Sequence, residues 1–229
     1  MSKNNKASRI IVSSMTLIEV GDFLKETVFS SDAISKLEER VDKKNKDYEK
    51  AYKVWLYNHD ENEFCKIFNP IRYKGKNSET LTMVPFWIKG DNEISFVLFS
   101  IFHYNGQKYV ASCIDGGLEF YSNHCLERYA ERCLDDKDAV IDEEFIGDML
   151  IYNLISQVRI FEYKGRKSTY NIVQDGVFIS VQLGHYRLMK TFLGTDNFFK
   201  NQKEFYNDEL ESLNRHLIDN GLPSITPAA

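Results

Sequence analysis

The strongest constraint on the fold is the dipeptide Asn105-Gly106, which separates two runs rich in β-branched and aromatic residues, EISFVLFSIFHY and QKYVASCI. Asn-Gly readily adopts the two positive φ angles of a tight hairpin turn, so these runs predict an antiparallel pair of strands. A third run, LTMVPFWI, precedes them and contains Pro85. Because proline cannot donate a hydrogen bond to a sheet, Pro85 predicts that this strand is an edge strand or a bulged one.

A second group of strands is predicted further along the chain, in the runs VRIFEYK, STYNIVQ and VFISVQLGHYRLMKTFL. Glycine and its polar neighbours supply the backbone freedom that tight turns need. Such turn residues separate the strands at Lys164-Gly165, Asp175-Gly176 and Gly184-His185. The last run is therefore expected to form a strand, a turn and another strand.

Helical periodicity marks the segments around these strands. A first amphipathic stretch covers about 15–29, and the clearest helix follows, with Ser31 or Asp32 as its N-cap. Its apolar seam consists of Ile34, Leu37, Val41, Tyr48, Ala51 and Trp55. We expect this seam to pack on the preceding stretch within the same chain, and a coiled-coil dimer is the alternative.

Two more helices are predicted between Ser122 and about Ser156, with a break at Asp135 to Asp138, and a last one over about 199–219. The order is then helices, strands, helices, strands and a helix. Segregated runs joined by hairpin turns favour an α+β fold, with an antiparallel sheet packed by helices. We expect a helical extension over 1–60 and an α+β domain over 61–229, or one continuous domain.

Composition excludes several classes of protein. Of 229 residues, 43% are hydrophobic, which is enough for a packed core, and the net charge of −5 excludes a global basic field for nucleic acid. The four cysteines form no CxxC pair and are expected to be free, mostly buried thiols. Without a signal-peptide pattern or a long apolar run, the chain is expected to be cytoplasmic and to have no membrane partner.

The stretch SNHCLERYAERC is the main candidate for a functional site. On a helical projection one side is apolar, and the other carries His124, Glu127, Arg128, Glu131 and Arg132. Like charges recur four residues apart on this polar side, which costs about 0.2–0.5 kcal/mol per pair. Three interpretations remain open: a solvated face, a structural network that ties the helix to the sheet, and a functional site.

Three kinds of chemistry can be compared for such a site. A metal site built from His124, Glu127 and Glu131 is disfavoured by the adjacent arginines. Nucleophilic catalysis by Cys125 with His124 is rejected, because neighbouring helical residues point about 100° apart. Acid–base catalysis on a phosphodiester fits better, since His124 can transfer a proton near neutral pH and Arg128 can bind a phosphate oxygen.

The final strands carry a local excess of positive charge, opposed only by Glu162 and Asp175. Strand alternation predicts that Arg187 and Thr191 face the same side, with Lys190 opposite unless a bulge intervenes. An ordinary charged hairpin is the alternative interpretation. The six basic residues are Arg159, Lys164, Arg166, Lys167, Arg187 and Lys190.

HCLERYAERCL resembles the helix H-A-L-x-R-M-x-E-R of small bacterial RelE/BrnT-like toxins, which belong to a wider group of barnase-like and colicin-like nucleases. The resemblance covers about residues 122–193. It implies RNA cleavage without metal or cofactor, by attack of the ribose 2′-OH on the neighbouring phosphate. His124 or Glu131 would be acid or base, and Arg128 or Arg187 would hold the developing charge. The substrate-binding residues would be Arg132, Arg166, Lys190 and Thr191.

The alternative function belongs to another class. The chain would be a non-catalytic interaction protein of a mobile element or phage, which binds a protein partner through the long helix, residues 31–58. Convergence of His124, Arg128 and Arg187 in one cleft would favour the enzyme. An exposed apolar stripe on the long helix would favour the partner.

Overall fold

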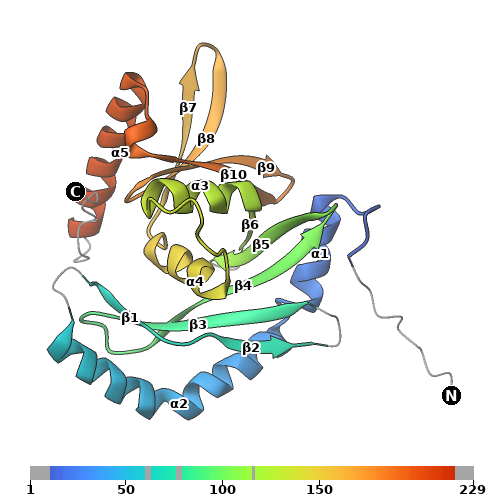
Figure 1. Cartoon of the computed structure of the whole chain (residues 1–229), viewed down its shortest axis with the longest axis vertical. Helices are drawn as coiled ribbons and strands as arrows, with labels where there is room; N and C mark the ends of the chain where they lie inside the picture. Colours follow the sequence, from blue (N-terminus) through green and yellow to red (C-terminus); the bar gives the residue numbers. More distant parts are fainter. Residues whose placement is uncertain (1–10, 60–62, 76–78, 115–116, 220–229) are drawn as a thin grey trace. The chain divides into compact units, whose positions relative to one another are not determined.

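The computed structural model describes residues 11–59, 63–75, 79–114 and 117–219 (Figure 1). The chain divides into two compact units, Met1–Leu118 and Glu119–Ala229. The boundary predicted near residue 60 lies inside the first of them. There the long helix contacts strands that follow it in sequence, so the helix is part of a mixed unit.

The first unit combines two helices, α1 (Leu17–Thr27) and α2 (Ser31–Asn58), with an antiparallel sheet. In this sheet β1 and β2 pair with successive parts of one edge of β3, and β4 and then β5 follow on its other edge. Asn105 and Gly106 join β4 to β5 with φ angles of 50° and 75°, which confirms the predicted hairpin. The strands are β1 (Cys65–Ile67), β2 (Ile71–Lys74), β3 (Thr80–Ile88), β4 (Ser95–Tyr104) and β5 (Gln107–Ile114).

Pro85 does not make β3 an edge strand, so the edge alternative is wrong, but the pairing opposite Pro85 is irregular, since residues 68–70 stand opposite only residues 84 and 85. β3 pairs with β4 on one side and with β1 and β2 on the other. Pro85 lies opposite the interruption between β1 and β2, where its carbonyl accepts a hydrogen bond from the Phe68 N–H at 2.9 Å. The proline nitrogen faces the same side as its carbonyl, so the missing N–H falls where no strand needs it.

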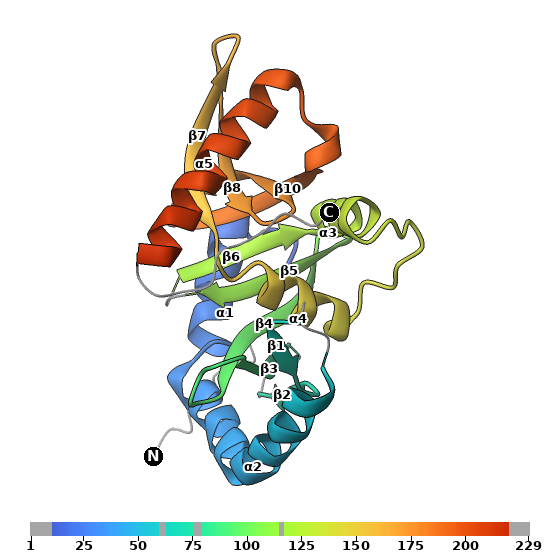
Figure 2. The ribbon, with the colours of Figure 1, turned by 90° about the vertical axis from the view of Figure 1, so that its left-hand side faces the viewer.

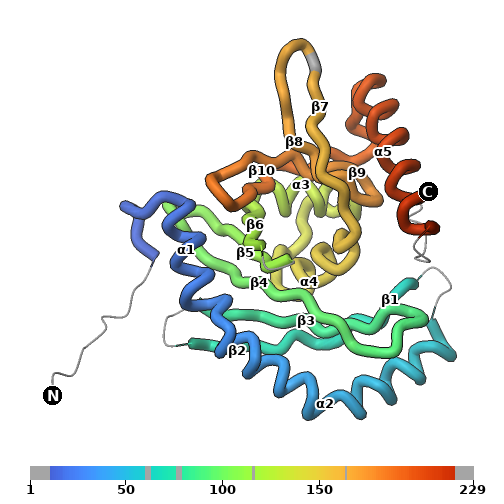
Figure 3. The backbone as a smooth tube through the Cα atoms, turned by 180° about the vertical axis from the view of Figure 1, so that it is seen from behind, coloured from blue at the N-terminus to red at the C-terminus, as the bar shows by residue number. Residues whose placement is uncertain are grey.

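Helix α2 packs within the chain, as expected, but against strands β2 and β3 (Figures 1 and 3). Its N-cap is Ser30, one residue before the predicted caps. Of the predicted seam, Leu37 and Val41 are buried, and Tyr52 is buried in place of Ala51. Tyr52 stacks on Trp87 of β3, with ring centroids 4.9 Å apart.

The second unit begins within β6 (Gly117–Ser122), a short strand that the sequence did not predict. Its sheet has the order β6-β10-β9-β8-β7, with β6 and β10 parallel and all other pairs antiparallel. The two helices predicted between 122 and 156 are confirmed as α3 and α4. The elements are α3 (Asn123–Cys133), α4 (Glu143–Tyr152), β7 (Gln157–Tyr163), β8 (Arg166–Val173), β9 (Gly176–Leu183), β10 (Tyr186–Gly194), a short 3-10 turn (Thr195–Asn197) and α5 (Lys200–Asp219).

Helices cover both faces of this sheet, and in Figure 2 strands β8 and β10 lie between α5 and α3. On one face, an apolar cluster joins the strands to α5. On the other, Tyr129 of α3 stacks on Phe178 at 5.8 Å and meets Phe192 edge-on at 5.1 Å. The predicted α+β class is therefore confirmed, with mostly antiparallel strands. Among the described residues, no helix has the length and apolar character needed to cross a membrane.

Candidate functional site

Helix α3 is fixed at its start by Ser122, the last residue of β6. The Ser122 hydroxyl accepts a hydrogen bond from the Cys125 N–H at 3.2 Å, which makes it the N-cap. The same hydroxyl donates to the Lys190 carbonyl of β10 at 3.1 Å. One side chain therefore both starts the helix and attaches it to the neighbouring strand.

The two sides of α3 differ as the periodicity predicts. Cys125, Leu126, Tyr129 and Ala130 are buried, whereas His124 and Glu127 are exposed. Burial raises the pKa of the Cys125 thiol far above its ordinary value, so this residue stays a neutral thiol. All four cysteines are free, as expected. The chemistry of α3 must therefore come from its polar side.

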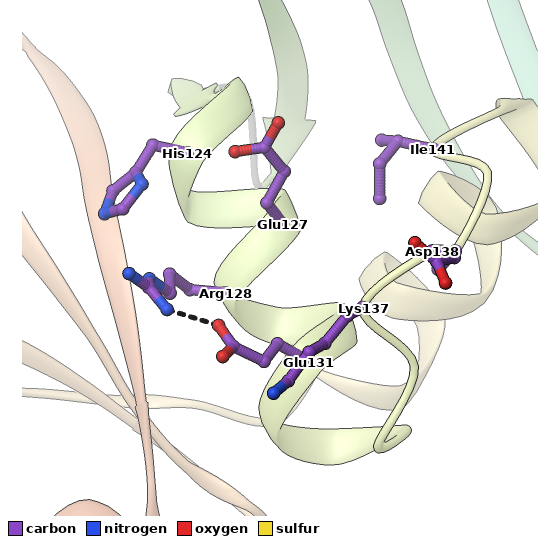
Figure 4. Close-up of a pocket in the computed structure, with 8 residues that line it drawn as sticks. His124, Glu127, Arg128, Glu131, Lys137, Asp138 and Ile141 are labelled. Atoms are coloured by element: carbon purple, nitrogen blue, oxygen red, sulfur yellow. Dashed lines mark hydrogen bonds and ion pairs between the residues drawn. The ribbon is translucent and has the colours of Figure 1, made fainter.

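A hollow of about 430 Å³ lies over this polar side (Figure 4). This volume is within the range of small-ligand pockets, about 300–1,000 Å³. Helix α3 lines one side of the hollow, and the loop that leads to α4 lines the other. The lining residues are His124, Glu127, Arg128 and Glu131 from α3, with Lys137, Asp138, Ala139 and Ile141 from the loop.

Arg128 and Glu131 form an ion pair inside the hollow, in which the Arg128 guanidinium donates to the Glu131 carboxylate (Figure 4). This hydrogen bond lowers the pKa of Glu131, so the carboxylate stays ionised. Both side chains remain about one-third exposed, at 37% and 30%. Glu131 is therefore better suited to orient Arg128 than to accept a proton.

His124 and Glu127 are the other two ionisable side chains that α3 contributes to the hollow. In Figure 4 the His124 imidazole and the Arg128 guanidinium project from the same side of α3. The Glu127 carboxylate accepts a hydrogen bond from the Asn123 amide at 2.5 Å, which restrains it one turn from His124. The hollow thus combines an imidazole, a carboxylate and a guanidinium within two helical turns.

Arg132 does not line the hollow. Its guanidinium donates to the Phe192 carbonyl of β10, and desolvation lowers its pKa. Arg132 therefore ties α3 to the sheet, which is the structural network that the sequence left open for this helix.

The other predicted site residues lie on the strands. A register shift between Met189 and Thr191 makes Lys190 a bulge residue. Thr191 then pairs with Ile179, whereas Arg187 pairs with Gln182, so Arg187 and Thr191 face opposite sides of β10. The prediction that they share a side is wrong for this reason. Arg166 is exposed where β8 begins, after the turn from β7.

Arg187 is not a lining residue of the hollow. It pairs with Glu119 of β6 near the start of β10, whereas α3 starts beside Lys190 and runs toward Phe192. The Arg187 guanidinium lies 3.3 Å from the Glu119 carboxylate and donates to the Asn171 side-chain oxygen. The expected convergence of Arg187 with His124 and Arg128 is therefore replaced by two separate groups.

The positive charge of the last strands is partly neutralised by acidic residues. Arg159 pairs with Glu209 of α5 at 2.8 Å, and Lys167 pairs with Glu162 at 3.6 Å. Together with Arg187, three of the six predicted cations thus have a carboxylate partner. The sequence count included Glu162 but omitted Glu209 and Glu119, because these two lie on α5 and β6, outside the segment counted.

Three relevant residues had no distinct signal in the sequence. Lys137 sits in the acidic run LDDKDA, and Asn123 and Glu119 precede the recognisable motif.

Among the described residues, no group of three or more histidine, cysteine, aspartate or glutamate side chains could hold a metal ion. The metal site considered for His124, Glu127 and Glu131 therefore has no support.

Comparisons with known proteins assign neither a family nor a function to the chain. No family model matches the chain, and neither the curated proteins nor the solved structures contain a match.

Proposed function

We propose that this protein cleaves RNA at the hollow on α3, without a metal ion. The observation that carries the proposal is the gathering of His124, Glu127 and Arg128 in one hollow of ligand size. Phosphodiester transesterification needs a proton acceptor, a proton donor and a cation close to the phosphate. These three side chains supply those functions.

The proposed reaction is the attack of a ribose 2′-OH on the adjacent phosphorus. Glu127 accepts the 2′-OH proton as the new P–O bond forms. His124, in its protonated form, donates a proton to the departing 5′ oxygen as the old P–O bond breaks. The products are a 2′,3′-cyclic phosphate and a 5′-hydroxyl, and no oxidant or cofactor is consumed.

Arg128 binds a non-bridging phosphate oxygen in this scheme, and Glu131 holds its guanidinium in place. The lining carries three carboxylates, Glu127, Glu131 and Asp138, against Arg128 and Lys137. Such a mixed site engages one phosphate group rather than a long stretch of backbone. We therefore expect a short RNA segment as substrate.

The layout of the second unit supports the same proposal. Helix α3 precedes the antiparallel strands β7 to β10, as in the toxin layout that the motif resembles. The Ser122–Lys190 hydrogen bond places the start of α3 beside Lys190 of the last strand. Lys190 is thus a candidate to contact the substrate next to His124, whereas Thr191, which pairs with Ile179, faces the α5 side of the sheet.

The test is incubation of the purified protein with mixed RNA, with and without a chelator. His124→Ala should lower cleavage about 10²- to 10⁴-fold, because a general acid is lost. His103→Ala is the matched control, since His103 is an exposed histidine of β4 in the other unit. Intact RNA under every condition, or equal cleavage by both variants, would refute the proposal.

A second candidate function is protein binding through α2. Near its C-terminal end, Val54 and Tyr57 keep 62% and 88% of their surface exposed. Contiguous exposed apolar side chains are typical of an interaction surface, and these two lie about one turn apart on α2. In this case the long helix would bind a partner while its other side packs on β2 and β3.

Val54→Asp with Tyr57→Asp would separate this candidate from the first. The double variant should abolish capture of a protein partner and leave RNA cleavage unchanged. Lys53→Asp, an exposed change on the same helix, is the control. A partner that binds the double variant as well as the unchanged protein would exclude this surface.

A further inference from the structure

We infer that Glu119, Asn171 and Arg187 form a second site, on the sheet of the second unit, that binds a phosphate group. The inference goes beyond the proposed cleavage and does not depend on it. It starts from a polar cluster on the α3 face of the sheet, to which strands β6, β8, β9 and β10 contribute. The cluster consists of Glu119, Tyr121, Asn171, Ser180 and Arg187.

Asn171 forms the fixed base of this cluster. It is 2% exposed, and its amide nitrogen donates to the Ser180 hydroxyl at 2.9 Å and to the Phe178 carbonyl at 3.3 Å. These bonds determine which way the amide points. The Asn171 oxygen is therefore directed at Arg187, whose Nη1 donates to it.

Glu119, on β6, restrains the same guanidinium nitrogen, Nη1 of Arg187. Its Oε1 lies 3.3 Å from Arg187 Nη1, and its Oε2 accepts a hydrogen bond from the Tyr121 hydroxyl at 3.4 Å. Both partners thus engage one end of the guanidinium. Because strands hold both partners, the orientation of the guanidinium plane is set before any ligand arrives.

The other edge of the guanidinium remains for a ligand. Within the described residues, no acceptor contacts Nε or Nη2 of Arg187, and the side chain keeps 29% of its exposure. The N–H bonds of Nε and Nη2 run parallel and match two oxygens of a phosphate. A preoriented guanidinium with this edge open is the arrangement that bidentate phosphate binding requires.

A purely structural role explains the cluster less well. A charge pair taken out of water contributes little net stability, and apolar residues of similar volume often do as well or better. The opposite face of the same strands is packed with apolar side chains, so the sheet does not need a charge pair to be stable. The cluster also lies on β10 away from the hollow, so it does not serve His124 directly.

The test uses the intact protein and the NMR signals of the arginine Nε–H groups. Titration with inorganic phosphate should shift the Arg187 signal until it saturates. Arg159 is the matched control, because it is also a strand arginine paired with a glutamate, but its Nε already donates to Glu209. Its signal should stay unchanged when chloride keeps the ionic strength constant.

Arg187→Lys keeps the charge but removes the parallel donors, so it should weaken phosphate binding about tenfold or more. Arg159→Lys should leave binding unchanged. A dinucleotide that binds more tightly than inorganic phosphate would identify the ligand as nucleic acid, and equal affinity would identify free phosphate. An Arg187 signal that does not move, or moves no more than that of Arg159, would overturn the site whether or not the protein cleaves RNA.

Discussion

The two faces of the sheet in the second unit use the same strands for different purposes. On the α5 face, Tyr170, Ile172 and Val177 are buried against Tyr206 and Leu210. On the α3 face, neighbouring residues of the same strands are aromatic under the helix and polar beyond its start. Strand alternation alone permits both outcomes, since it sends successive side chains to opposite faces.

The difference shows which face of the sheet supplies stability and which face can carry polar, reactive groups. The α5 face is a continuous apolar contact, which contributes free energy in proportion to the area removed from water. Helix α3 packs along part of β10, from Lys190 to Phe192, and beyond the start of the helix the strands carry Arg187 and Glu119. Polar groups can be kept at such a place because the opposite face already supplies the packing.

The largest expected effect is on the α5 face. Ile172 is fully buried, so Ile172→Ala should lower the free energy of unfolding by about 2–5 kcal/mol, through lost burial and the cavity left behind. Ile160→Ala is the control, because Ile160 on β7 is 67% exposed. Urea denaturation measures both. Equal losses would break the contrast between a packed and an open surface.

A smaller effect is expected for the charge pair. Glu119→Leu leaves the Arg187 guanidinium without its carboxylate and should cost about 1–3 kcal/mol, because both groups are largely buried. Glu119→Leu combined with Arg187→Met should restore stability to within about 1 kcal/mol of the unchanged protein. A double variant as unstable as the single one would show that the pair is structural.

Glu119 should also give the α3 face a distinct dependence on pH. Burial raises its pKa, and the nearby Arg187 opposes this only in part. A raised pKa means that the contribution of Glu119 to stability is present below its ordinary pKa and is lost as pH rises through the higher folded value. The stability of the unchanged protein relative to Glu119→Gln should therefore fall as pH rises from the ordinary pKa of glutamate through the higher folded pKa. A rise over this range would contradict the desolvation of Glu119.

Glu131 should behave in the opposite way. The hydrogen bond from Arg128 lowers its pKa, so its contribution is present above its ordinary pKa and is lost as pH falls through the lower folded value. Relative to Glu131→Gln, the unchanged protein should lose stability on acidification. The effect is small because the group is in contact with solvent. An absence of any difference would indicate that the pair does not persist in solution.

The smallest effect is expected at the exposed end of the β7–β8 hairpin. Lys167 and Glu162 are 3.6 Å apart, with 71% and 56% of their side chains exposed. Lys167→Ala should change the free energy of unfolding by less than about 1 kcal/mol, since water and salt screen such pairs. A larger loss would mean that the hairpin packs against something further.

Local patterns in the sequence were sufficient for most elements. The φ angles at Asn105-Gly106 and Lys164-Gly165 are positive, as tight turns require, and the hairpins form where these turns were predicted. The apolar periodicity of α3 correctly separated buried Tyr129 from exposed His124. Strand β6 was missed because it is short and begins at a glycine, Gly117, so its strand character depends on pairing within the sheet, including that with β10.

The site could be predicted only in part. His124, Arg128 and Glu131 share a helix, so their common side follows from helical spacing and lines one hollow. The contacts of Arg187 depend on which strand lies beside β10. That strand is β6, which places Glu119 opposite Arg187. The face of the sheet to which Thr191 points depends on a one-residue bulge at Lys190. This bulge reverses the direction of every later side chain of the strand.

The sequence by itself determined the helices, the hairpins and the polar side of α3, because these follow from interactions between residues close along the chain. Only the tertiary structure decided which polar groups meet. It brought Lys137 to the hollow, placed Arg132 on the Phe192 carbonyl and joined Arg187 to Glu119 and Asn171. The physical reason is that register, bulges and strand order fix contacts between distant segments, and these depend on packing of the whole unit rather than on any local pattern.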